Sequence, residues 1–185
     1  PVYECGTRTG VANLLVGCDV WITADAVEVG RVSGASDHQG VNVTPAYGLG
    51  QSVVAWASLC NDPSPPSTTH VSQAGPSPLP APGFLPVYAG AQQATVTNVV
   101  NGARLTLSRN GIFQYAFSSW GYQHLVSLNP PFTAGETLSA TQQLCPGDPP
   151  SGDGTVTVLP CSALPAPGVD PVQAGDTAVH LTSFV

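Results

Sequence analysis

The residues with the most evident chemistry in this sequence are its five cysteines, Cys5, Cys18, Cys60, Cys145 and Cys161. None belongs to a C-x-x-C pair, and no histidine stands at metal-ligand spacing beside one of them. This pattern favours disulfide bonds over a zinc site. Five cysteines in a chain of 185 residues also indicate an oxidising location, so we expect an extracellular protein, secreted or held at a cell surface.

Catalytic chemistry is not indicated. The histidines His38, His70, His124 and His180 occupy unrelated positions, and no G-x-S-x-G motif or recurring Ser/His/Asp arrangement accompanies them. Asp148 and Asp153 in "PGDPPSGDG" would suit calcium, but Asp and Gly are also ordinary turn residues, and we favour a solvated turn. We therefore expect no enzymatic activity, no metal and no cofactor.

Aromatic side chains gather in "YAFSSWGY", and exposed aromatic clusters bind sugars or proteins. We expect Tyr115, Trp120 and Tyr122 to form a possible binding or packing surface, while core packing accounts for Phe117. Asn42 begins the single N-glycosylation sequon, N-V-T, and is a candidate glycosylation site.

The charge of the chain excludes some partners. The chain has no lysine and only four arginines against eleven carboxylates, which gives a net charge of −7. This charge repels phosphate backbones, so nucleic acid is not an expected partner. No apolar run approaches the roughly 18 residues of a membrane span.

The elements that position these residues come from an internal repeat. When the sequence is shifted by 85 positions it aligns with itself without a gap, and 21 of 85 positions are identical. The match includes the proline-rich phrases "LPAPGF" from Leu79 and "LPAPGV" from Leu164. We expect domains at 1–85 and 86–170, followed at 171–185 by the first strand of a third repeat.

Each repeat has the pattern of a β-sandwich. "ATVTNVV", "GARLTLSRNG" and later segments of the second repeat alternate apolar and polar residues, and Asn110-Gly111 is a hairpin signal. Val20 and Ile22 match Leu105 and Leu107 on one expected inward face. About seven short strands per repeat predict an all-β fold of two tandem immunoglobulin-like antiparallel sandwiches with an extra C-terminal strand. The prolines of the linking phrase favour a stiff connection.

The chain resembles a known group over both repeats. The stretches "VTNVVNGARLTLSRNG", "PPFTAGETLSATQQLC" and "PPSGDGTVTV" are similar to the bacterial immunoglobulin-like repeats found in tandem on cell-surface and secreted proteins. The resemblance rests on strand punctuation, including "PFTAGETLSA" from Pro131, rather than on catalytic residues. It implies a sandwich fold in a surface or secreted protein.

The repeat also suggests how the cysteines pair. Within the second repeat, Cys145 has only Cys161 as a partner, so we expect that bond. We expect Cys60 to pair with Cys5 in the first repeat. Cys18 falls on the inward face and is left as a buried free thiol or as a bond to a neighbouring chain.

Three copies of the opening strand for two sandwiches leave one copy, 1–15 or 171–185, without a sandwich. A strand with an open edge pairs readily with another chain. We therefore expect a structural subunit or segment of a surface fibre or stalk, self-associating head-to-tail by strand donation. The assembly strand would use His180, Leu181, Phe184 and Val185.

Two other functions remain open. The chain is alternatively an adhesin or carbohydrate-binding module that recognises glycans or a host cell surface through Tyr115, Trp120 and Tyr122. As a third alternative, it is an accessory region of a larger secreted enzyme.

Overall fold

The structure is a computed structural model that describes residues 1–164, 168–169 and 181–182. These residues form antiparallel strand pairs and one short 3₁₀ turn, η1 (Cys161–Ala163). The prediction of an all-β antiparallel sandwich fold is confirmed. None of the helical structure in the described part is long and apolar enough to cross a membrane.

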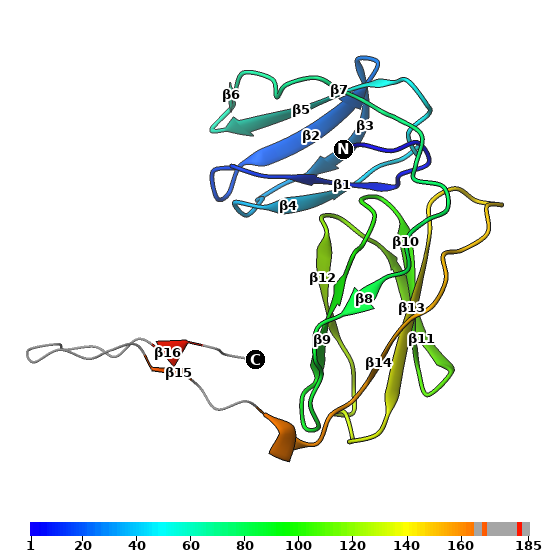
Figure 1. Cartoon of the computed structure of the whole chain (residues 1–185). Coiled ribbons are helices and arrows are strands. Elements are labelled where there is room, and N and C mark those ends of the chain that lie inside the picture. Colours follow the sequence, from blue (N-terminus) through cyan, green and yellow to red (C-terminus); the bar gives the residue numbers. More distant parts are fainter. Residues whose placement is uncertain (165–167, 170–180, 183–185) are drawn as a thin grey trace, which may run out of the picture.

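The first seven strands form two facing sheets, drawn in blue to green in Figure 1. They are β1 (Arg8–Val11), β2 (Asp19–Ala24), β3 (Val27–Val32), β4 (Gln39–Asn42), β5 (Ser52–Leu59), β6 (Asp62–Pro63) and β7 (His70–Val71). One sheet pairs β1 with β4. The other has the order β3-β2-β5-β6, with β7 also paired to β5.

The next seven strands form a second pair of sheets. They are β8 (Gly83–Phe84), β9 (Gln93–Thr97), β10 (Arg104–Arg109), β11 (Ile112–Ser118), β12 (Gln123–Ser127), β13 (Thr137–Gln143) and β14 (Gly154–Thr157). The sheet orders are β12-β9-β8 and β11-β10-β13-β14. β8 pairs with β9 from Gly83 onward, slightly before the predicted boundary at 85/86, and the domain limits themselves remain predictions.

Each pair of sheets encloses its own hydrophobic core. Val20 and Ile22 of β2 lie in the first core, and Leu105 and Leu107 of β10 lie in the second, all of them fully buried. These are the residues that the alternation placed on the inward face. Burial of one face of each strand is what a period of two residues requires in a sandwich.

The repeat at 85 positions is visible in the strands and turns. β2 (Asp19–Ala24) and β10 (Arg104–Arg109) are separated by 85 residues at both ends. The turn after β10 uses Asn110 and Gly111, both with positive φ, which confirms the predicted hairpin. Asp25 and Ala26 take the same conformation after β2. The two repeats therefore share backbone detail as well as sequence.

The C-terminal segment also follows the repeat. β15 (Gly168–Val169) pairs with β16 (Leu181–Thr182), and Val169 lies opposite Leu181. β8 and β9 pair in the same register 85 residues earlier, with Phe84 opposite Val96. Of the predicted assembly strand, Leu181 thus pairs within its own chain, and His180, Phe184 and Val185 lie outside the described residues.

Candidate functional site: the junction between the repeats

The junction is the region where residues 1–10, 39–42 and 73–79 of the first repeat meet residues 100–103, 118–120 and 144–145 of the second. The edge of the first pair of sheets lies across one end of the second pair in Figure 1. A disulfide bond between Cys5 and Cys145 crosses it. It joins cysteines 140 residues apart and ties the two repeats together covalently.

This bond corrects the predicted pairings Cys5–Cys60 and Cys145–Cys161, which do not form. Cys60 and Cys161 are exposed and unpaired instead. The prediction assumed that each sandwich closes its own bond, whereas Cys5 and Cys145 lie on the facing ends of the two repeats, with Cα atoms 5.0 Å apart. That spacing suits a disulfide. Cys18 is buried and unpaired, as one of its two predicted alternatives stated.

A small apolar cluster packs beneath the disulfide. Val100, Ala103 and Leu144 of the second repeat are buried, and Tyr3 and Leu79 pack against them. Leu144 also lies against Gly75, where an added Cβ would collide with its side chain. The cluster removes apolar surface of both repeats from water and so favours one relative arrangement of the two.

Trp120 packs on a pair of glycines in the first repeat. Gly10 of β1 and Gly40 of β4 lie opposite each other in the register of that sheet. A Cβ at Gly40 would stand 2.6 Å from Cδ1 of Trp120, so only glycine leaves room for the indole ring. Glycine inside a strand is a recognised sign of close approach by another group. Trp120 packs against the flat surface that these two glycines create.

Polar contacts surround this packing. The hydroxyl groups of Thr7 and Ser118 lie 2.6 Å apart, and Nη1 of Arg8 donates to the Ser118 carbonyl at 3.3 Å. Nδ2 of Asn101 donates to the carbonyl of Pro1 at 3.0 Å. These hydrogen bonds connect residues at least 100 positions apart in sequence. They add directional contacts to the covalent and apolar ones.

The charged groups of the junction are partly desolvated. Burial lowers the pKa of Arg8, and its Nε atom is buried without a hydrogen-bond partner among the residues that the structure describes. Burial also lowers the pKa of His124, and the nearby positive charge of Arg8 lowers it further. The His124 ring lies 4.3 Å from the ring of Phe117. Protonation of His124 would therefore place a second positive charge near the junction.

The predicted aromatic surface is distributed over different environments. Tyr115 is half-buried beside Phe117 and packs against the second core. Trp120 lies in the junction, and Tyr122 is 70% exposed. Asn42 is exposed at the end of β4. Binding of glycans and glycosylation of Asn42 stay predictions.

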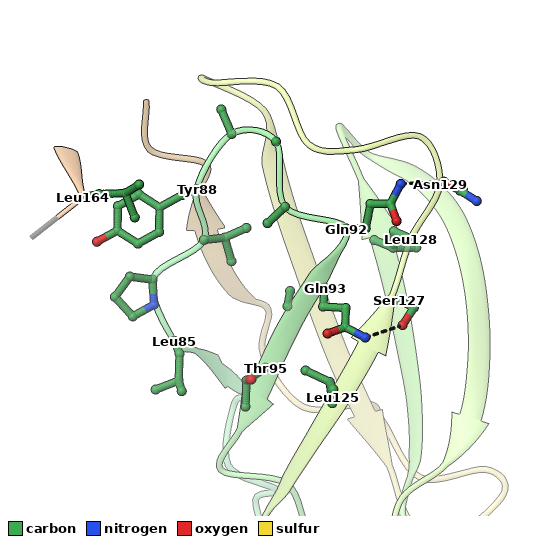
Figure 2. A pocket seen from close by; sticks show the side chains of 16 residues that line it. Leu85, Tyr88, Gln92, Gln93, Thr95, Leu125, Ser127, Leu128, Asn129 and Leu164 are labelled. Carbon is green, nitrogen blue, oxygen red and sulfur yellow. Dashed lines mark hydrogen bonds between the residues drawn. The ribbon is translucent and has the colours of Figure 1, made fainter. Parts of the chain in front are cut away.

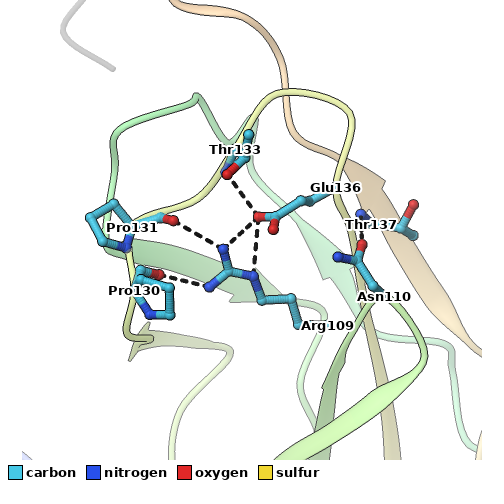
Figure 3. A network of polar contacts seen from close by, with 7 residues as sticks. All are labelled: Arg109, Asn110, Pro130, Pro131, Thr133, Glu136 and Thr137. Atoms are coloured by element: carbon cyan, nitrogen blue, oxygen red, sulfur yellow. Dashed lines mark hydrogen bonds and ion pairs between the residues drawn. The ribbon is translucent and has the colours of Figure 1, made fainter.

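An ion pair between the buried Arg109 and the partly exposed Glu136 was not predicted from the sequence. Arg109 donates to Oε2 of Glu136 through Nε at 3.0 Å and through Nη2 at 2.6 Å, and to the carbonyls of Pro130 and Pro131, as Figure 3 shows. Its guanidinium lies 5.3 Å from the centre of the Phe132 ring. The only sequence signal was a charged residue at a strand position expected to face inward.

No cluster of histidine, cysteine and acidic side chains in the described ranges is suited to hold a metal ion. Glu136 has a pKa lowered first by the backbone hydrogen bond from Thr133 and then by Arg109. This carboxylate accepts hydrogen bonds from the Thr133 N–H and from Arg109, and Arg109 in turn donates to the carbonyls of Pro130 and Pro131.

Comparisons with known proteins find a partial likeness to solved structures alone. No protein-family model and no curated protein matches the chain. Among solved structures, the BSP domain of a biofilm associated protein has a TM-score of 0.41 at 22% identity, covering 79% of this chain and 25% of that one. The fibronectin(III)-like modules of Clostridium thermocellum CbhA have a TM-score of 0.28 at 14% identity, covering 88% of this chain and 93% of theirs.

The central fibronectin-III array of RIM-binding protein has a TM-score of 0.33 at 10% identity, covering 91% of this chain and 68% of that one. The chain thus spans about a quarter of the biofilm associated structure that it matches. The class of the protein, an all-β protein of antiparallel sandwiches, follows from its own strands and sheets.

Proposed function

We propose that this chain is a non-enzymatic segment of an extracellular stalk or fibre, in which immunoglobulin-like repeats joined at rigid junctions hold another part of the protein at a distance. The observation that carries the proposal is the junction itself. A disulfide, an apolar cluster and Trp120 seated on Gly10 and Gly40 all connect the same two repeats.

Such a junction does more than connect two domains. Domains within one chain are expected to move relative to each other unless the interface between them is substantial. The Cys5–Cys145 bond joins residues 140 positions apart. By restricting the unfolded chain it stabilises the folded state by roughly 5 kcal/mol in the chain-entropy estimate. A fixed angle between successive repeats is what a spacer requires, because it sets the reach of the whole array.

Cysteine use and composition support an extracellular setting. A disulfide between two repeats persists only where the surroundings are oxidising. Charged residues make up 8% of the chain, and the polar surface is made largely of uncharged side chains. The aromatic residues favour the structural role over glycan binding, since Tyr115 and Trp120 are engaged in packing.

The tail supports an array more than a donated strand. β15 and β16 repeat the register of β8 and β9, so the described tail residues follow the course of a next repeat's opening strands. A strand reserved for another chain would not need a partner of its own. Donation of residues 171–185 therefore stays a sequence prediction, separate from the proposal of a stalk segment.

Small-angle X-ray scattering of the native chain and of a triple variant, Cys5→Ser, Cys145→Ser and Trp120→Gly, tests the proposal. We expect one arrangement of the repeats to account for the native scattering, and a range of arrangements to be needed for the variant. Cys60→Ser is the matched control, because it removes an exposed thiol outside the junction. Native scattering that requires the same range as the variant would contradict a rigid spacer.

A further inference from the structure

The residues that the second repeat contributes to the junction have equivalents 85 positions earlier, on the first repeat. Several of these equivalent residues are exposed. We call this exposed group the receiving face, and it consists of Leu15, Val16, Leu59 and Cys60. These residues stand 85 positions before Val100, Asn101, Leu144 and Cys145, respectively. Leu15 is 68% exposed and Val16 is 77% exposed, whereas Val100 is buried. Exposed apolar residues grouped in this way mark interaction surfaces.

The first repeat's half of the junction has its counterpart on the second repeat. We call it the docking face, and it consists of Tyr88, Leu125, Cys161 and Leu164. Tyr88 and Leu164 stand 85 positions after Tyr3 and Leu79, which pack in the junction cluster. In Figure 2 Tyr88 and Leu164 lie together at one end of an open groove, and Leu125 lies further along it near Thr95.

Backbone contacts place Cys161 within the docking face. Gln73 donates its N–H to the carbonyl of Val2, and Leu159 donates in the same way to the carbonyl of Val87. Two residues further along, Gly75 and Cys161 therefore occupy equivalent places. Gly75 lies against Leu144, next to the junction disulfide. Cys161 is thus located where a Leu-Cys pair of another repeat would come to lie.

The neighbourhood of the Cys161 thiol supports this placement. Its Sγ donates to the carbonyl of Ala89 at 3.0 Å. The next residue, Gly90, stands at the repeat position of Cys5 and shares its positive φ. The second repeat lacks a cysteine at 90 but carries an exposed one beside it.

The sizes of the side chains on the two faces differ from those at the equivalent positions of the junction, and the two differences offset each other. Gly10 and Gly40, which receive Trp120, are replaced on the docking face by Thr95 and Leu125, paired in the same register. Leu125 is 57% exposed. Ala35 and Ser119 make matching hydrogen bonds, to Cys18 and Ala103 respectively. Ser36, which lies next to the receiving face, therefore takes the place of Trp120.

In the junction the larger side chain, Trp120, belongs to the second repeat, whereas between the two free faces the larger side chain, Leu125, lies on the docking face. Trp120 fits over two glycines in the junction, and Leu125 would fit against Ser36 between the free faces. An exchange of volume across a contact preserves its packing.

We propose that the docking face of one chain binds the receiving face of a second copy, and that Cys161 of the first forms a disulfide with Cys60 of the second. The contact repeats the junction between the repeats of one chain. In the covalent step the two thiols lose two protons and two electrons to a small-molecule disulfide, which is reduced to two thiols while the new S–S bond forms.

Because the two faces are different and lie on different repeats, the contact is heterologous and extends head-to-tail into an open chain of copies. This inference rests on the proposed function insofar as it treats the repeats as units of one array. It adds the partner, a second copy, and the residues that join the copies.

Oxidation with oxidised glutathione, followed by non-reducing electrophoresis and mass spectrometry of the linked peptides, tests the inference. We expect a ladder of multimers from the native chain, with Cys60 linked to Cys161. Cys60→Ser and Cys161→Ser should each remain monomeric alone, and an equimolar mixture of the two should stop at the dimer. Cys18→Ser is the control for a buried thiol and should leave the ladder unchanged.

A second pair of variants separates a built contact from random oxidation. Leu15→Asp places a carboxylate on the receiving face and should slow multimer formation about tenfold, because that charge would be buried in the contact. Leu49→Asp changes an equally exposed leucine outside both faces and should have no effect.

Three results would overturn the inference: no intermolecular bond, equal amounts of Cys60–Cys60 and Cys161–Cys161 bonds, or equal rates for Leu15→Asp and Leu49→Asp. None of these would affect the proposed spacer, because the rigidity of the junction within one chain is measured independently by scattering.

Discussion

The two repeats have matching strands but are stabilised by different means. In the second repeat, the buried Arg109 forms an ion pair with Glu136, which is partly exposed, at the end of β10. In the first repeat the same positions carry Ala24 and Gln51. The hydrophobic cores are alike, so the difference lies at the ends of the strands. The two repeats therefore share the pattern of their core residues but differ in the side-chain interactions that hold the turns at the strand ends.

We expect substitutions in the two hydrophobic cores to have the greatest effect on stability, and they show whether the cores are equivalent. Leu107→Ala and Ile22→Ala each empty a fully buried position at the same place in a repeat. We expect each to lower the free energy of unfolding of its own repeat by about 3 kcal/mol. Denaturant unfolding measures this, with the stacked Trp21 and Trp56 reporting on the first repeat. A cost below about 1 kcal/mol for only one variant would show that the cores differ.

The second prediction concerns the Arg109–Glu136 ion pair, whose positions in the first repeat carry Ala24 and Gln51. Arg109→Met removes a buried guanidinium that donates to the carbonyls of Pro130 and Pro131, and should lower the free energy of unfolding by about 2 kcal/mol, because hydrogen bonds made by charged groups contribute about that much. Arg31→Met, which removes an exposed pair with Asp19, is the matched control and should cost less than about 1 kcal/mol. Equal costs in thermal or denaturant unfolding would refute the distinction.

A smaller effect concerns the pH dependence of the second repeat. Burial holds the pKa of His124 below its ordinary value of 6.5 in the folded state. The unfolded state therefore binds a proton first, so stability is fully present above about pH 6.5 and is lost as the pH falls from there through the lower folded-state pKa.

His124→Gln should remove this pH dependence, whereas His38→Gln, at an exposed position, should keep it. We expect a change of no more than about 1 kcal/mol, because half of the ring is open to solvent. Unfolding measured between pH 5 and 8 in all three proteins checks it. The hypothesis fails if the native chain and His124→Gln have the same pH profile.

The smallest effect concerns the matching hairpin turns. Ala26 has a φ of 65°, in the left-handed region where its Cβ is strained, and Gly111 occupies the same place in the second repeat. Ala26→Gly should stabilise the first repeat by about 0.5 kcal/mol, and Gly111→Ala should destabilise the second by about 1 kcal/mol. Thermal unfolding that shows effects of the opposite sign would contradict the equivalence of the turns.

The sequence predicted the strands because the relevant signals are local. Alternation placed Ile22 and Leu107 inward, and Asn110-Gly111 marked the hairpin. Because the repeat has no gap, a strand predicted in one repeat supported the prediction of a strand 85 positions away in the other. The sandwich fold needed no information about how the two repeats lie relative to one another.

The junction could not be predicted in this way. Whether Cys5 bonds to Cys60 or to Cys145 depends on the relative orientation of two sandwiches, and no local pattern encodes that orientation. Gly10 and Gly40 did carry a signal, since glycine is unusual inside strands. Its meaning becomes evident only once Trp120 is seen to lie on them.

The central claim is that the junction fixes the two repeats at one angle. The exposed thiols of Cys60 and Cys161 allow spin labels to be attached to the native chain, one on each repeat, while Cys18 is buried and Cys5–Cys145 stays oxidised. Double electron–electron resonance then measures the distance between the labels in dilute, monomeric protein. A junction that fixes the angle gives a single narrow distance distribution, and a broad or multimodal distribution would contradict a fixed angle.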